Sequence, residues 1–306
     1  MTRHFLRDDD LSPDEQRQVI DRAIAMKGDR FAERPLEGPQ TVAVIFDKTS
    51  TRTRVSFAAG ISDLGGSPLI INPGESQLGG KESVADTARV FERMLAAVVW
   101  RTFAQSGLDE MAAGTTIPVV NALSDDFHPC QLLADLVTVK EHRGELAGQK
   151  LAFFGDTASN MAHSYLLACA TAGMHVVLSG PVDEAPRGDI LSDAQRIAAD
   201  TGGSAGFTVD AREAAADADV IVTDTWVSMG QESEKDARLR RFETYRVDAE
   251  LMQQAAQDAI FLHCLPAYRG FEVTADVIDG PQSVIWDEAE NRLHAQKALL
   301  AWLLEQ

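Results

Sequence analysis

Five consecutive hydroxyl and guanidinium residues form the first group that could do chemistry: Ser50, Thr51, Arg52, Thr53 and Arg54. They follow an apolar, β-branched run at 41–46 and precede a helix-like stretch that begins near Val55. The first N–H groups of a helix have no partner within it, and the helix dipole favours an anion there. Guanidinium groups bind phosphate oxygens in pairs. We therefore predict a phosphate-binding turn, although each residue alone also suits a helix cap or a solvated arginine.

The spacing around this turn narrows the class of phosphate ligand. The turn lacks the GxxxxGK[ST] pattern of a nucleotide-binding P-loop, so we expect a small phosphate compound rather than a nucleotide. The later turn GDTASN, after the run that ends at Phe154, lacks the GxGxxG pattern of dinucleotide-binding sheets. A nicotinamide-dependent dehydrogenase is therefore disfavoured.

Further polar side chains follow the other expected strands. They are Arg101 after AAVVW, His128 and Gln131 after IPVVNAL, Asn160 after KLAFFGD, Asp224 after ADVIVT, and His263 and Cys264 after AIFL. In open α/β sheets, ligands bind outside the carboxyl ends of the strands. We therefore expect one cleft between two sheets to collect these residues. Each has an ordinary alternative as a surface arginine, a helix cap or an inert buried thiol.

The cysteines and histidines give no pattern of a metal site or of a disulfide framework. Cys130, Cys169 and Cys264 are odd in number, widely spaced and form no CxxC pair. His263 and Cys264 are adjacent, and neighbouring strand residues point to opposite faces, so we do not expect one zinc ion to take both. We predict no metal and no other cofactor.

The elements that must position these residues alternate between short apolar runs and longer helix-like stretches. Expected strands are 41–46, 68–71, 96–100, 117–123, 150–154, 175–178, 219–223, 260–262 and 283–286, and expected helices are 55–64, 131–142, 160–172 and 289–304. This rhythm predicts an α/β fold with two domains, each a mostly parallel sheet flanked by helices, and an active site in the cleft between them. We place the first domain at 1–144, the second at 149–288, and a C-terminal helix at 289–306 that packs back on the first domain.

Composition excludes several classes of function. The chain has 306 residues, with 28 Lys and Arg against 47 Asp and Glu, which gives a net charge of −19. Nucleic-acid binding requires a basic face, so we expect no nucleic-acid partner. No run approaches the roughly 18 apolar residues of a membrane helix, and the start MTRHFLRDDDLS has no apolar signal segment. We expect a soluble cytoplasmic protein that does not bind membranes.

Several motifs together resemble one family over nearly the whole chain. FDK followed by STRTR resembles the carbamoyl-phosphate signature of the aspartate and ornithine carbamoyltransferase superfamily, and HPCQ resembles its HPxQ motif. DTWVSMG and HCLP resemble the ornithine branch, whereas the aspartate branch carries an HPLP-type motif. QLGGKES resembles a loop that members insert into a neighbouring subunit's active site. Tyr268, Phe271 and Ser159 depart from the usual pattern, which bears on fine specificity.

The resemblance implies a set of roles for residues of this chain. The implied catalytic residues are Arg52, Arg101, His128 and Cys264. The implied carbamoyl-phosphate ligands are Ser50, Thr51, Arg52, Thr53, Gln77, Arg101, His128, Gln131, Cys264, Leu265 and Arg292, so the domain at 1–144 binds carbamoyl phosphate. The implied ornithine ligands are Asn160, Asp224, Ser228 and Met229, so the domain at 149–288 binds L-ornithine. It also implies a homotrimer in which the Gln77 loop reaches a neighbouring site, and an activity in arginine metabolism.

Two groups of alternatives stay open at this point. A carbamoyltransferase with another acceptor would use aspartate, putrescine or an N-acylated ornithine. Asp224 followed by Ser228 and Met229 favours a free α-amino acid group, which putrescine and acylated ornithine lack, and the HCLP strand end offers no cation for aspartate's second carboxylate. A non-catalytic anion-binding protein would explain the phosphate turn but would leave Asp224 and Cys264 without a role.

Overall fold

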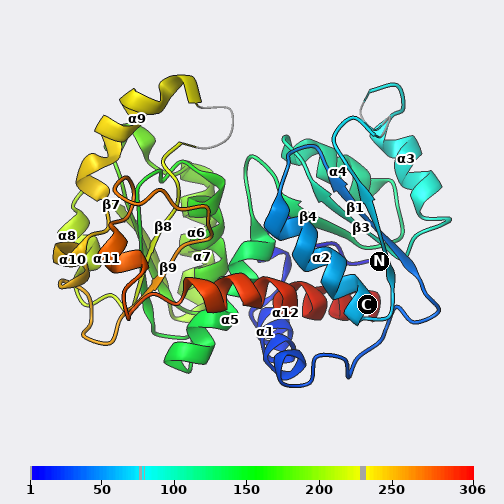
Figure 1. Ribbon diagram of the computed structural model, residues 1–306, viewed down its shortest axis with the longest axis horizontal. Helices are drawn as coiled ribbons and strands as arrows, with labels where there is room; N and C mark the ends of the chain where they lie inside the picture. Colours follow the sequence, from blue (N-terminus) through cyan, green and yellow to red (C-terminus); the bar gives the residue numbers. More distant parts are fainter. Residues whose placement is uncertain (1, 76–77, 79, 228–231) are drawn as a thin grey trace. The chain divides into compact units, whose positions relative to one another are not determined.

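The computed structural model describes residues 2–75, 78, 80–227 and 232–306 and contains two compact units. Unit 1 comprises Met1–Val137 and Glu290–Gln306, and unit 2 comprises Thr138–Ala289. Each unit holds one parallel sheet with helices on it (Figure 1). The predicted α/β class with two parallel sheets is confirmed.

Unit 1 is built on a four-stranded sheet in the order β2-β1-β3-β4. The strands are β1 (Thr41–Phe46), β2 (Ser67–Ile71), β3 (Ala97–Arg101) and β4 (Val119–Leu123). The helices are α1 (Pro13–Gly28), α2 (Thr51–Asp63), α3 (Val84–Phe91), α4 (Gln105–Ala113) and the first part of α5 (Pro129–Arg143), with the short 3₁₀ turn η1 (Asp8–Asp10). The strand order reverses between β1 and β3, and such a switch point is where open α/β sheets bind ligands.

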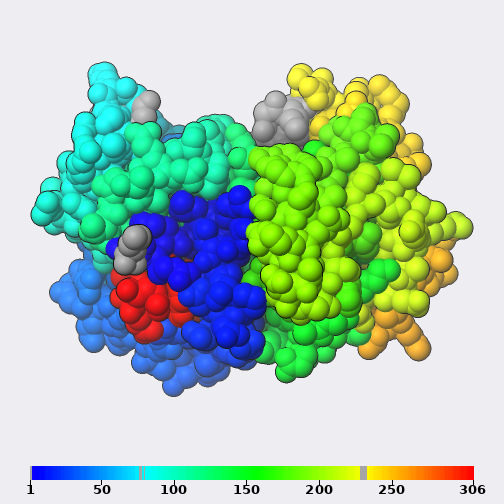
Figure 2. All heavy atoms as spheres, turned by 180° about the vertical axis from the view of Figure 1, so that it is seen from behind, coloured from blue at the N-terminus to red at the C-terminus, as the bar shows by residue number. Residues whose placement is uncertain are grey.

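Both ends of the chain lie in unit 1. Residues 290–304 of α12 (Ile285–Leu304) pack among N-terminal segments, and Arg3 lies over the Trp302 ring with its guanidinium carbon 5.4 Å from the ring centroid. Figure 2 shows the C-terminal residues in red surrounded by N-terminal residues in blue. On α2, a Cβ added at Gly60 would lie 3.0 Å from the Lys297 side chain, so a glycine allows the two helices to approach closely.

Unit 2 is built on a five-stranded sheet in the order β7-β6-β5-β8-β9, which reverses between β5 and β8. Its strands are β5 (Lys150–Phe154), β6 (His175–Ser179), β7 (Ser204–Thr208), β8 (Val220–Thr223) and β9 (Ile260–Leu262). Its helices are α6 (Asn160–Thr171), α7 (Gly188–Thr201), α8 (Ala211–Ala215), α9 (Lys235–Phe242), α10 (Ala249–Met252) and α11 (Ala275–Ile278), with 3₁₀ turns η2 (Val182–Glu184), η3 (Glu232–Glu234) and η4 (Glu243–Tyr245).

The structure differs from the predicted elements in several places, and helices such as α1, α3 and α7 were not predicted. The expected strand at 283–286 is wrong, because Ile285 is buried as the first residue of α12 and Ser283 forms only an isolated bridge with Phe261. The edge strand β7 was missed, because its sequence SAGFT has a glycine and few apolar residues. Helix α2 begins at Thr51 rather than near Val55.

Candidate active site

The phosphate-binding turn predicted from sequence begins a helix directly. Ser50 has an extended backbone, and its hydroxyl accepts a hydrogen bond from the Thr53 N–H at 3.3 Å, so α2 starts at Thr51. The first turn of α2 contains no acidic residue. Thr51 and Arg52 are exposed there, whereas Thr53 is buried. A helix start with exposed donors and no carboxylate is suited to an anion.

Three polar residues from separate helices meet in the interior of unit 1. Arg292 of α12 donates to the Thr53 hydroxyl at 3.1 Å and to the Gln131 amide oxygen at 2.5 Å. Gln131 in turn donates to the Asp135 carboxylate at 2.8 Å. All four residues are buried. A fully bonded network of this kind fixes side-chain directions, so the Thr53 hydroxyl and the Gln131 amide are held in place before a ligand arrives.

His128 lies near Arg101, Arg52 and Arg292 in unit 1. Arg101 ends β3, and its carbonyl accepts from the Asp47 N–H at 2.8 Å, so the ends of β1 and β3 lie side by side. Burial lowers the pKa of His128 well below its usual range, and the nearby Arg292, Arg101 and Arg52 lower it further. His128 is therefore a neutral imidazole at pH 7 and can donate or accept a hydrogen bond without adding charge.

Arg54, the fifth residue of the turn, has a different partner. Its guanidinium carbon lies 5.1 Å from the centroid of the Phe46 ring, a cation–π contact with the end of β1. Of the two arginines in STRTR, Arg52 is the one exposed at the start of α2.

Acidification is expected to destabilise the protein in part through His128. Because its pKa is lowered on folding, the unfolded chain binds this proton first below about pH 6.5. Stability therefore falls as the pH falls, by up to about 1.4 kcal/mol per pH unit for one group. Urea unfolding at pH 7 and pH 5.5 tests this. Between these two pH values, the free energy of unfolding should fall less in His128→Asn than in the wild type. Equal losses in the two proteins would refute it.

The ends of β8 and β9 bring a carboxylate and a thiol together in unit 2. The Cys264 thiol donates to the Asp224 carboxylate at 3.2 Å, and the Thr225 N–H donates to the same oxygen at 2.7 Å. Burial raises the pKa of Asp224, and its contacts with His263, the Thr225 N–H and Cys264 oppose that rise. A half-buried carboxylate is a strong potential partner for an ammonium group.

His263 and Cys264 do not point apart, so the geometric reason for excluding a metal was wrong. Both residues lie beyond the end of β9, where strand alternation no longer applies, and donor atoms of Asp224, His263 and Cys264 lie within 4.8 Å of one another. His263 is nevertheless engaged at both ring nitrogens, by the Leu265 N–H at 2.9 Å and by the Glu272 carboxylate at 3.3 Å. A metal would have to displace these contacts, and the absence of a metal stays a prediction.

The remaining predicted acceptor ligands are only partly described. Asn160 is the first residue of α6, and its neighbour Ser159 caps that helix by accepting from the Ala162 N–H at 3.3 Å. Since β5 pairs with β8, the Asn160 loop and Asp224 follow neighbouring strands at the switch point. Gln77, Ser228 and Met229 lie outside the described residues. Leu265 follows Cys264 with a positive φ of 58°.

Sequence reasoning missed two buried carboxylates beside this site. Glu272 accepts from His263 and from the Tyr268 N–H at 2.5 Å, and Glu288 accepts from the His263 N–H at 2.8 Å. Both glutamates are fully buried. They hold the backbone on either side of Cys264. An acidic residue within a mostly apolar stretch is a local signal for Glu272, whereas Glu288 lies among other acidic residues and has no such signal.

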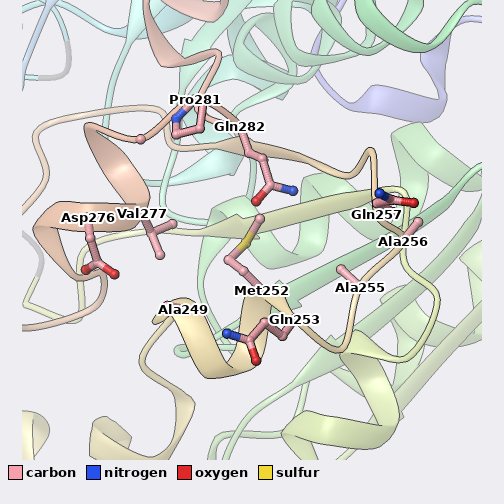
Figure 3. Close-up of a pocket in the computed structure, with 11 residues that line it drawn as sticks. Ala249, Met252, Gln253, Ala255, Ala256, Gln257, Asp276, Val277, Pro281 and Gln282 are labelled. Carbon is pink, nitrogen blue, oxygen red and sulfur yellow. The ribbon is translucent and has the colours of Figure 1, made fainter.

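Unit 2 contains one cavity near the start of β9 and another beside the residues that follow Asp224. One of about 470 Å³ is lined by residues of α10, α11 and the chain just before β9, among them Met252, Gln253 and Gln282 (Figure 3). It is at the amino end of β9 and contains none of the predicted site residues, so we do not assign it to the reaction. The other, of about 190 Å³, is lined by Thr225, Trp226 and Glu272 among others and adjoins Asp224 in sequence.

The helix start of α2 suits a phosphate group, and the half-buried Asp224 carboxylate beside a thiol suits an amine. Together, in two parallel α/β units, these features favour a two-domain group transferase. The family described as "Aspartate/ornithine carbamoyltransferase, carbamoyl-P binding domain" matches residues 3–141, and the "Asp/Orn binding domain" of the same family matches residues 147–303. The chain belongs to the aspartate/ornithine carbamoyltransferase family and is a carbamoyltransferase.

Full-length relatives and solved structures agree with this family. The chain is 69% identical to an ornithine carbamoyltransferase of Clavibacter sepedonicus and 55% identical to one of Mycolicibacterium smegmatis, each over 100% of both chains. It is similar to the structure of ornithine carbamoyltransferase from Pyrococcus furiosus, with a TM-score of 0.95, 42% identity and coverage of 99% of this chain and 97% of that one. None of the helices in the described part of the chain is long and apolar enough to cross a membrane.

Proposed function

We propose that this chain transfers the carbamoyl group of carbamoyl phosphate to the side-chain amine of L-ornithine, giving L-citrulline and phosphate. The observation that carries the proposal is the contrast between the two switch points. That of unit 1 gathers Arg52, Arg101 and a neutral His128, and that of unit 2 presents the half-buried Asp224 carboxylate. The first suits an anionic donor and the second suits an amine.

The residues of unit 1 act on carbamoyl phosphate in this proposal. Arg52 and the start of α2, with the Ser50, Thr51 and Thr53 hydroxyls, bind the phosphate oxygens. Arg101 and His128 donate to the carbonyl oxygen, where negative charge develops as the amine attacks. Gln131 and Arg292 orient the carbamoyl end, which their bonded network supports.

The residues of unit 2 act on the acceptor. Asp224 and Ser228 bind the α-ammonium group, and Asn160 and Met229 bind the α-carboxylate. The side-chain amine, which titrates near the lysine value of about 10.4, loses a proton to solvent and then attacks the carbamoyl carbon. The carbon–oxygen bond to phosphate breaks, and phosphate leaves with the bonding electrons. Cys264 acts as a positioning group beside the amine, because direct attack by the amine needs no covalent intermediate.

A panel of acceptors tests the proposal. Purified protein with carbamoyl phosphate should form product with L-ornithine at least about a hundredfold faster than with L-aspartate, putrescine or N-acetylornithine. A buried polar site rejects analogues that lack its partner group by such factors or more. Faster carbamoylation of any other acceptor would replace ornithine in the proposal, and no carbamoylation of any of the four would refute it.

We also propose that the protein is a homotrimer in which Gln77 reaches a neighbouring site, and that it acts in the cytoplasm in arginine biosynthesis or, in the reverse direction, in arginine catabolism. The resemblance of QLGGKES to the inserted loop of its relatives supports the trimer. Cys130, Cys169 and Cys264 form no disulfide bond, which suits a reducing compartment. Light scattering in solution should give about three times the chain mass of 33.2 kDa, and a monomeric mass would refute the trimer.

A further inference from the structure

Unit 2 contains a buried ion pair between Arg238 and Asp156, and neither residue is among those assigned to carbamoyl phosphate or to ornithine. Arg238 of α9 donates through Nη2 to the Asp156 carboxylate and through Nε to the Trp226 carbonyl at 2.6 Å. The Arg238 and Asp156 side chains are only 7% and 13% exposed. One guanidinium therefore joins three segments that are distant in sequence.

Each of the joined segments leads to an acceptor ligand. Asp156 lies two residues after β5 in the loop that leads to Asn160, and its carboxylate also accepts from the Ala158 N–H at 3.2 Å. Trp226 lies two residues after Asp224. Arg238 is on the first helix after Ser228 and Met229 in the sequence, so it links the chain before those residues to the chain after them.

Packing leaves the guanidinium little freedom. Its carbon lies 5.1 Å from the centroid of the Phe242 ring, and that ring lies 5.9 Å from the Trp226 ring. On the other side of Trp226, Gly155 has a φ of 119°, and a Cβ there would lie 2.8 Å from the indole nitrogen. The indole is thus packed between the end of β5 and α9, and the Trp226 carbonyl has a defined direction.

A contribution to folding stability does not by itself explain why this ion pair is present. Burying two charges costs about as much as their attraction returns, and apolar side chains of similar size often serve stability as well. Burial indeed raises the pKa of Asp156, and Arg238 only partly opposes that rise. A planar guanidinium that bonds a carboxylate and a carbonyl at once does what apolar packing cannot, because it fixes the two segments in one mutual orientation.

We propose that Asp156 and Arg238 are positioning residues for the amino-acid acceptor, which hold the Asn160 loop and the Asp224 segment at the spacing that the acceptor requires. This rests on the proposed function in that the acceptor is an α-amino acid. Neither residue touches the substrate, so their loss should impair acceptor binding and leave the carbamoyl-phosphate residues of unit 1 unaffected.

Steady-state kinetics of Asp156→Asn, Arg238→Met and Arg238→Lys test the proposal, with Arg241→Met as the matched control. Arg241 is on the same helix but is 43% exposed and pairs with Glu184 at the surface. We expect the KM for ornithine to rise about 10- to 100-fold in Asp156→Asn and Arg238→Met, as displacement of a site by about 1 Å can do. Arg238→Lys keeps the charge but loses the planar guanidinium that donates to two partners at once, so its KM for ornithine should lie between those of these variants and that of the wild type.

The KM for carbamoyl phosphate separates positioning from a general structural role, and it should stay close to wild type in Asp156→Asn, which keeps the side-chain volume. The unfolding midpoint of this variant should fall, because the buried Arg238 guanidinium loses its counter-ion. The kinetics are therefore measured well below that midpoint. An unchanged KM for ornithine in Asp156→Asn and Arg238→Lys would overturn the proposal, as would equal losses for both substrates. If the wild-type protein itself forms no citrulline, the proposed function fails instead, so the two failures are distinguishable.

Discussion

Replacement of Arg52 by alanine is expected to lower kcat/KM for carbamoyl phosphate by about a hundred- to a thousandfold. Loss of one donor to the charge that develops in the transition state costs about 10²–10³ in rate. In this chain the guanidinium would neutralise the phosphate as it leaves. Arg52 is exposed in the first turn of α2, so its removal opens no cavity and leaves the Ser50 cap intact.

Initial rates of citrulline formation, with carbamoyl phosphate varied at saturating ornithine, measure this effect. Arg17→Ala is the matched control, because Arg17 is also exposed in unit 1 but pairs only with Asp14 on its own helix. It should keep the wild-type rate. An Arg52→Ala protein with near-normal turnover would remove Arg52 from the mechanism and, with it, the assignment of the phosphate to the start of α2.

Replacement of Asp224 by alanine is expected to lower kcat/KM for ornithine while the KM for carbamoyl phosphate changes little. Truncation of one partner of a buried, hydrogen-bonded charge pair costs about 2–5 kcal/mol, which is roughly 30- to several-thousandfold. Asp224 is half-buried beside the Cys264 thiol, and the α-ammonium group of ornithine would be its charged partner.

Two further variants show whether the charge of Asp224 is what matters. Asp224→Asn keeps the size of the side chain and can still accept hydrogen bonds from Cys264 and Thr225. If its kcat/KM for ornithine falls nearly as far as that of Asp224→Ala, the charge of Asp224 is what matters. Asp189→Ala, which removes an exposed carboxylate of unit 2, should behave as the wild type. If Asp224→Ala instead raised only the KM for carbamoyl phosphate, Asp224 would have to be reassigned to the donor.

The sequence predicted the fold class and the strand ends well because both follow from local patterns. An apolar, β-branched run followed by Ser50 to Arg54 encodes a strand, a turn and a helix start within a few residues. The first residue of helix α2 is harder to predict, because hydroxyl residues have weak helix propensity. The hydrogen bond from the Thr53 N–H to the Ser50 hydroxyl decides where α2 begins. The 283–286 run resembles a strand because three apolar residues are too few to distinguish the helical period of about 3.6 residues from the strand period of about 2.

Contacts between distant segments could not be predicted in this way. Asp156 and Arg238 are 82 residues apart, and Arg292 is 161 residues from Gln131. No local spacing encodes such pairs. Arg238 and Glu272 are charged, so the sequence alone places them on the surface, whereas the structure buries both. The side-chain directions of His263 and Cys264 were misjudged for a related reason, since the chain leaves β9 before either residue.

Equilibrium titration of carbamoyl phosphate into Arg52→Ala and Asp224→Ala tests most directly whether the donor is bound by unit 1 and the acceptor by unit 2. We expect Asp224→Ala to bind carbamoyl phosphate within about threefold of the wild-type Kd, and Arg52→Ala to bind it at least about a hundredfold more weakly. Weak binding by Asp224→Ala together with retained binding by Arg52→Ala would contradict that division of the two substrates.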